Sequence, residues 1–251
     1  MLFGNVFIIL LNSKREVIYK NRGGIKMKRK PHGQMSESLL IAALLSISGG
    51  LQDAYTYISR GKVFANAQTG NIVLLSQRLV EGDWAAAAHY FVPLLFFAMG
   101  IAASEGIRFK YQKAQKIHWR QLVLFTEVLL LFLVGFLSTE YNLIGNALVS
   151  FSCAMQVQAF RKVKGYAFAS TMCIGNMRSG MEAMCAYIKT GEKAIFYKAI
   201  HYWGIIIMFA FGAGLGGSLI PFLGLYTIWV SCILLIISLL IMFIKEEIEE
   251  R

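Results

Sequence analysis

The chain is poor in charged residues and in proline. Charged residues make up 16% of its 251 positions, whereas a soluble globular domain carries about 25%. So few charges cannot cover a soluble surface, but they suit helices that face lipid. Only Pro31, Pro93 and Pro221 are present, so long uninterrupted helices are permitted. The scarcity of both residue types predicts an all-α integral membrane protein.

Cysteine is also scarce, and its placement argues against a metal site or a disulfide framework. The four cysteines stand singly in apolar stretches, without a CxxC motif or a His/Cys cluster. They are interpreted as small packing residues. We therefore expect no metal and no cofactor.

Positive charge is in excess, with a formal net charge of +11. The basic residues gather in the N-terminal tail, at 108–120 and at 161–164, between apolar runs. This distribution is typical of cytoplasmic loops that face anionic lipid, and it argues against nucleic-acid binding. Residues 1–35 are predicted to be a basic tail. Met27, followed by the basic residues 28–30 before the first apolar run, is interpreted as the translation start. Residues 1–26 are accordingly interpreted as upstream read-through or a disordered extension.

Six apolar runs are long enough to span a bilayer, which takes about 20 residues. Two shorter segments, 64–80 and 167–188, are interrupted by polar residues and glycine. The six long runs are 37–58, 85–107, 120–138, 142–160, 195–219 and 222–244.

Loop charge predicts how these segments cross the membrane. The positive-inside rule places all three basic regions in the cytoplasm. This is satisfied if 64–80 and 167–188 are re-entrant or broken helices, which gives six spans with both termini inside, in a bacterial inner membrane. The alternative of eight true spans stays open.

The two halves of the chain resemble each other. The first contains LQDAY at 51–55, GKVFA at 61–65 and TGN at 69–71, and the second contains QVQAF at 156–160, GYAFA at 165–169 and IGN at 174–176. His89 and Gly100 likewise match His201 and Gly212. The predicted transmembrane domain, 36–245, thus comprises repeats at about 36–138 and 141–245, followed by a charged tail at 246–251. Three spans per repeat make the two copies inverted, whereas four would make them parallel.

The strings GGLQDA at 49–54 and GKVFANAQTGN at 61–71 resemble the signature of the YoaK-like family of uncharacterised bacterial membrane proteins. The resemblance covers about 36–245 and implies a six-span inner-membrane protein, without an established substrate or activity. The second copy departs from the signature, since it has Ile174 where threonine is expected.

Polar residues at membrane depth are the candidates for a substrate or ion pathway, because they are costly there unless they are paired or face water. Asp53 is the sharpest of them, as a coupling acid or as an interfacial acid in an ion pair with Arg60 or Lys62. Gln158 stands where the first copy has Asp53. The candidate pathway residues are Gln52, Asp53, Asn66, Gln68, Thr69, Gly70, Asn71, Gln158, Gly175 and Asn176.

Further ionisable residues are interpreted as structural or as proton carriers. Arg178 and Glu182 are four positions apart, so they lie on one helix face and can pair. Glu127 lies midway along 120–138 and is expected to pair within the bundle. His89 and His201 begin matched helices and are candidate proton relays, although interfacial histidines are commoner.

Three functions remain open. An inverted repeat with broken helices favours a transporter or channel for an unknown small solute. An intramembrane enzyme or lipid-handling protein needs Asp53 and His89 within hydrogen-bond reach. A non-catalytic partner subunit would have a filled core. Membrane lipid is the expected partner, and a homo-oligomer is allowed.

Overall fold

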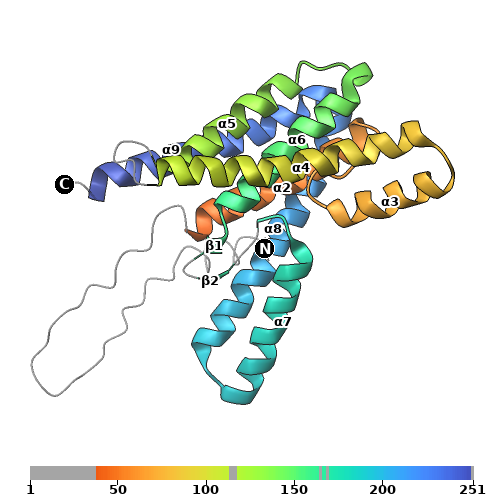
Figure 1. Ribbon diagram of the computed structural model, residues 1–251. Coiled ribbons are helices and arrows are strands. Elements are labelled where there is room, and N and C mark those ends of the chain that lie inside the picture. Colours follow the sequence, from red (N-terminus) through yellow and green to blue (C-terminus); the bar gives the residue numbers. More distant parts are fainter. Residues whose placement is uncertain (1–37, 113–117, 164–165, 168–169, 250–251) are drawn as a thin grey trace, which may run out of the picture.

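The computed structural model describes residues 38–112, 118–163, 166–167 and 170–249. The predicted tail at 1–35 and the Met27 start lie outside these residues. Eight α-helices dominate the described part, with two short 3-10 helices (η) and one two-residue strand pair (Figure 1). The elements are α2 (Leu39–Ser59), α3 (Gln68–Val80), α4 (Trp84–Tyr111), α5 (Trp119–Val134), η2 (Thr139–Tyr141), α6 (Asn142–Ala159), β1 (Lys162–Val163), β2 (Tyr166–Ala167), α7 (Cys173–Thr190), α8 (Lys193–Leu223), η3 (Gly224–Thr227) and α9 (Ile228–Glu249).

The helices coincide with the eight predicted segments, so the prediction of an all-α membrane protein is confirmed at that level. Three stretches in the described part are long and apolar enough to cross a membrane, namely Leu39–Ser59, Trp84–Tyr111 and Lys193–Phe243. The third contains α8, η3 and most of α9. The six-span topology remains a prediction.

Local signals fix several helix ends. Ser38 caps α2 by accepting a hydrogen bond from the Ile41 amide at 3.3 Å, and Asp83 caps α4 by accepting from the Ala86 amide at 3.0 Å. The turn after α2 uses positive φ at Gly61 (84°) and Lys62 (64°). Gly191 ends α7 with φ of 68°, the left-handed conformation that favours glycine at a helix C-terminus.

Close helix pairs form at glycines. A Cβ on Gly212 of α8 would collide with the Ile47 carbonyl of α2, and one on Gly100 of α4 would collide with the Phe151 carbonyl of α6. Each glycine therefore lets two backbones approach, as small residues do between membrane helices. The resulting pairs, α2 with α8 and α4 with α6, are the most extensive helix–helix contacts in the described part of the chain.

The apolar core lies where α2, α5, α6 and α9 meet. Leu45, Leu124, Val149 and Leu235 are fully buried there. Outward-facing apolar side chains line the other faces of α4, α8 and α9, as expected for helices in lipid. Examples that are more than 40% exposed are Phe91, Leu95, Met99, Phe211, Ile233 and Leu240.

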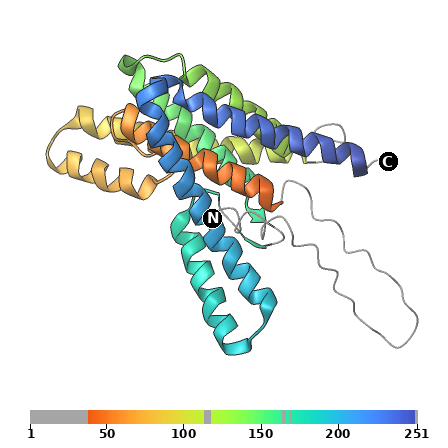
Figure 2. The ribbon, with the colours of Figure 1, turned by 180° about the vertical axis from the view of Figure 1, so that it is seen from behind.

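Two hairpins project from this core. The α3–α4 hairpin and the α7–α8 hairpin extend in different directions, and both views agree on this (Figures 1 and 2). In each, the shorter helix packs mainly on its partner in the hairpin and is otherwise exposed. Asn71 is the buried residue of α3. Both short helices therefore begin in the core and end away from it.

Candidate functional site

Asp53 anchors the irregular segment that precedes α3. It lies on α2 with 7% of its surface exposed, and its Oδ1 accepts a hydrogen bond from the Asn66 amide at 2.7 Å. The backbone amides of Ala65 and Ala67 also interact with the carboxylate. Asn66 in turn donates from its side chain to the Gly49 carbonyl at 3.2 Å. These bonds fasten the start of the short helix to the middle of the bundle.

The Gln68 and Asn71 side chains fold the same segment onto itself. Asn71 donates to the Phe64 carbonyl at 2.6 Å and accepts from the Phe64 amide at 3.0 Å. Gln68 accepts from Asn71 at 2.9 Å and donates to the Ala65 carbonyl at 2.8 Å. Gly70 lets the Phe64 ring lie close, and Thr69 is exposed. The Gln68 and Asn71 side chains are thus satisfied by the backbone at Phe64 and Ala65, whereas Asn66 Oδ1 is buried without a hydrogen-bond partner among the described residues.

The segment before α7 reaches the same place from the other half of the chain. The methyl group of Thr171 lies against Gly49, where an added Cβ would collide with it and would come within 3.8 Å of Asn66 Nδ2. Cys173, the first residue of α7, is close enough to Asp53 to interact electrostatically. The starts of α3 and α7 therefore meet beside Gly49, in the middle of α2.

Gln156 holds the segment before α7 by hydrogen bonds, as Asp53 holds the segment before α3. Its Nε2 donates to the Ser170 hydroxyl at 2.9 Å and to the Leu45 carbonyl at 3.3 Å. Asn176 is buried near the start of α7, while Gly175 has open space around it. Gln156 thus contacts the segment before α7, as Asp53 contacts the segment before α3.

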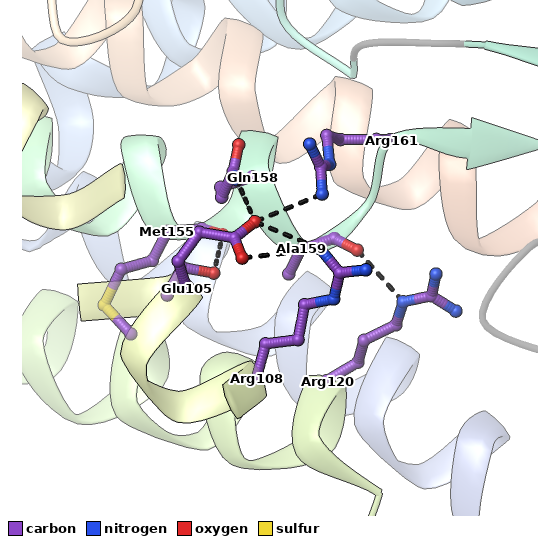
Figure 3. A network of polar contacts seen from close by, with 8 residues as sticks. Glu105, Arg108, Arg120, Met155, Gln158, Ala159 and Arg161 are labelled. Atoms are coloured by element: carbon purple, nitrogen blue, oxygen red, sulfur yellow. Dashed lines mark hydrogen bonds and ion pairs between the residues drawn. The ribbon is translucent and has the colours of Figure 1, made fainter. Parts of the chain in front are cut away.

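Gln158 instead belongs to a charged cluster at the ends of α4 and α6 (Figure 3). It donates to the Glu105 carboxylate, which also contacts Arg161 at 3.1 Å and Arg108 at 3.3 Å. Gln158 is therefore held by this cluster, and its role in a pathway stays a prediction. Gln156 lies two residues earlier, about 200° away around α6, and contacts the segment before α7 instead.

Arg120, next to this cluster, caps the C-terminal end of α6. Arg120 donates from Nε to the Ala159 carbonyl at 3.0 Å (Figure 3), where a cation is favourable at a helix C-terminus. His118 caps α5 in a reciprocal arrangement with Gln121. Burial and then the Arg120 charge lower the pKa of His118 to about 4.

The sequence suggested an ion pair between Asp53 and Arg60, but Arg60 binds other groups. Its side chain is fully buried and binds the C-terminal end of α5, donating to the Val134 and Leu137 carbonyls at 2.9 and 2.8 Å. It also donates to the Tyr55 hydroxyl at 2.9 Å. Lys62 lies 4.8 Å from the centre of the Tyr57 ring. Arg60 is therefore a helix-capping residue that satisfies carbonyl groups at the end of α5.

Of the other ionisable candidates in the described part of the chain, Arg178 and Glu182 form an ion pair and Glu127 does not. Arg178 and Glu182 form the predicted ion pair at 2.9 Å, but their side chains are 81% and 64% exposed, so they do not pair inside the bundle. Glu127 is fully buried, and its hydrogen-bond partner is the neutral Gln52 at 3.4 Å. The expectation of an ion pair at Glu127 is therefore wrong among the described residues.

The two histidines lie on α4 and α8, whereas Asp53 lies on α2. His89 contacts the Gly61 carbonyl through Nε2 at 2.8 Å, and His201 lies within α8. Among the described residues, no hydrogen bond joins Asp53 to His89. The Asp53–His89 pair that the enzyme hypothesis needs is thus not formed by a hydrogen bond within the described part of the chain.

Sequence reasoning missed a polar cluster in the core. Ser48 and Ser231 are 2.6 Å apart, and both contact Gln52, at 2.9 and 3.2 Å. The Cys153 thiol donates to Gln52 Oε1 at 2.7 Å. Single serines and a single cysteine in apolar runs give no signal in the sequence, because only the fold brings them to Gln52 and Glu127.

Comparison with known proteins agrees with the membrane assignment. The profile of the family described as protein of unknown function (DUF1275) matches residues 41–241. The chain is 25% identical over 204 residues to the UPF0700 transmembrane protein YoaK of Bacillus subtilis (strain 168), an alignment that covers 78% of this chain and 89% of that protein. No solved structure matches the chain.

Proposed function

The chain belongs to the DUF1275 family, as its resemblance to YoaK-like proteins predicted, and from this premise we propose that it moves a small polar solute across a bacterial inner membrane. The meeting of the starts of α3 and α7 beside Gly49 carries the proposal. Secondary transporters bind their substrates near the bilayer midplane, where interrupted helices end. Irregular backbone at that depth is tolerated when it lies within protein or lines a water-filled path.

The packing of the helices supports an inverted duplication. Gly100 and Gly212, which match in the two repeats, each contact the first helix of the opposite half, at Phe151 and Ile47. Asp53 and Gln156 each hold the segment before the following short helix. In the six-span topology, α3 then enters from the outer face and α7 from the cytoplasmic face, and alternate opening of the two hairpins exposes the junction to each side.

Charge at the junction favours an uncharged or zwitterionic solute. Each helix start contributes about half a positive elementary charge. The single negative charge of Asp53 offsets two such helix starts, so the junction is close to neutral. An anion would have to displace the Asp53 carboxylate from the backbone amides of the Ala65–Ala67 segment, which already bind it.

Reconstituted vesicles test the proposal. Uptake of a panel of small neutral, zwitterionic and charged solutes is measured for the wild type, Asp53→Asn and Gly49→Ala. Asp53→Asn weakens the anchor of the α3 start, and a methyl group on Gly49 collides with Thr171, so both variants should lose uptake at least about tenfold. Glu81→Gln, on the exposed end of α3, is the control. Absence of uptake for every solute would reject the proposal.

A further inference from the structure

Glu127 is a buried carboxylic acid that the transport proposal does not use. It lies near the middle of α5 with none of its surface exposed. Oε1 accepts from Gln52 Nε2 at 3.4 Å, a long hydrogen bond. Oε2 is buried and has no hydrogen-bond partner among the described residues. One oxygen of this acid is therefore left without a donor inside the membrane.

Within the described part of the chain, no positively charged group contacts Glu127. Gln52 of α2 contacts Glu127, and Ser48 of α2 and Ser231 of α9 contact Gln52 in turn. The thiols of Cys153 on α6 and Cys232 on α9 lie within electrostatic range of the carboxyl group. Cys153 and Cys232 are the titratable members of this set, and the Asp53 carboxylate lies beyond Cys153. No ion pair to Glu127 occurs among the described residues. An ionised carboxylate buried without a cation costs several kcal/mol, so this site requires a proton or a small cation.

We propose that Glu127 is a proton-binding site within the membrane, with the proton carried on Oε2. Only a protonated acid removes the charge without an additional ligand, and a lone oxygen without a donor is the atom that can hold it. Metal ions such as Na⁺ take several oxygen ligands. The side-chain oxygens of this network are those of Glu127, Gln52 Oε1 and the two serine hydroxyls. Gln52 Oε1 accepts from Cys153, and the serines are bonded to each other and to Gln52.

A row of polar groups leads from this site towards the α3–α7 junction. Gln52 contacts Glu127 on one side and accepts the Cys153 thiol on the other. The Cys153 sulfur lies within electrostatic range of both Glu127 and Asp53 and near the Asn66 side chain. Asn66 donates its backbone amide to Asp53.

This arrangement allows protonation to act on the junction through Gln52. Loss of the proton from Glu127 strengthens its attraction for the Gln52 N–H groups. Because Gln52 also accepts from Cys153, movement of its amide alters the contacts of Cys153 with Asn66 and hence the anchor of α3. The proton site thereby becomes the coupling site of the proposed transporter, and only this coupling rests on the proposed function.

Infrared spectroscopy tests proton binding without any solute. At neutral pH the reconstituted wild type should show the carbonyl stretch of a protonated carboxylic acid, which Glu127→Gln removes and the exposed control Glu81→Gln retains. Gln52→Met should shift the same band, because it removes the hydrogen bond to Oε1. Absence of the band at neutral pH would overturn the proposal. So would Na⁺-dependent thermal stabilisation that Glu127→Gln abolishes, since it would identify a metal-ion site.

Uptake in the presence of a pH gradient tests the coupling separately. The gradient should accelerate uptake by the wild type and not by Glu127→Gln, whose uptake without a gradient should persist. An equal acceleration of both proteins would contradict the coupling. Failure of all uptake with an intact infrared band would reject transport and leave the proton site standing.

Discussion

The Asn71 side chain pairs with the Phe64 main chain as a neighbouring strand would, donating to its carbonyl at 2.6 Å and accepting from its amide at 3.0 Å. This pairing occupies backbone groups that helix α3 cannot satisfy. Replacement by alanine leaves both groups without their partner, at about 1–3 kcal/mol for each buried group. Asn71→Ala should therefore lower the Tm of the purified protein.

The matched control for Asn71 is Ser76→Ala on the same helix. Ser76 is exposed and bonds only the Ile72 carbonyl, at 2.8 Å, so its loss should leave the Tm within the error of the measurement. Equal losses in the two variants would show that the turn between α2 and α3 does not depend on Asn71.

Arg60 should be irreplaceable by lysine. Its guanidinium reaches several separate acceptors around the end of α5, whereas an ammonium group is a single point with a different geometry. Hydrogen bonds to charged groups contribute about 1.5–3 kcal/mol each, so Arg60→Lys should destabilise by about 3 kcal/mol or more. Chemical unfolding in detergent measures the loss. Arg78→Lys, which affects an exposed ion pair with Glu81, should change stability by at most about 1 kcal/mol.

Glycine at position 212 should be required for helix packing. A methyl group there would meet the Ile47 backbone, which cannot rotate away as a side chain can. Gly212→Ala should cost about 1–3 kcal/mol through overpacking. Gly214 lies two residues further along α8 and has nothing within 4 Å of an added Cβ. Gly214→Ala should therefore be neutral or slightly stabilising, and similar Tm losses in both would contradict the α2–α8 packing.

Stability should fall in mild acid because of His118. Its pKa is lowered from 6.5 to about 4 by burial and then by Arg120. Between these values the unfolded chain binds the proton that the folded protein excludes, so stability declines as the pH falls from about 6.5 towards 4. His118→Asn keeps a side chain suited to a helix start and should remove this part of the decline. The difference in Tm between the two proteins across this pH range measures it; a constant difference would contradict the shift.

The positions of the helices could be read from hydropathy, because apolar runs of this length have one stable form in a membrane. The rotation of each helix about its own axis could not be read from hydropathy. Gln156 and Gln158 differ by about 200° around α6, and only the fold places Gln156 at the α7 start. Arg60 and Glu127 were expected in ion pairs, because a charged side chain at membrane depth is usually paired with an opposite charge. The helix-end carbonyls that bind Arg60 and the neutral groups around Glu127 come from segments distant in sequence.

The most direct test is the side of the membrane on which the two short helices end. Val80, at the end of α3, is 90% exposed and Ile188, near the end of α7, is 75% exposed. Each is changed to cysteine in a protein that lacks Cys173 and Cys185, and intact cells are treated with an impermeant thiol reagent. The inverted arrangement predicts labelling of Val80→Cys in intact cells and of Ile188→Cys only after permeabilisation. Labelling of both from the same side would contradict it.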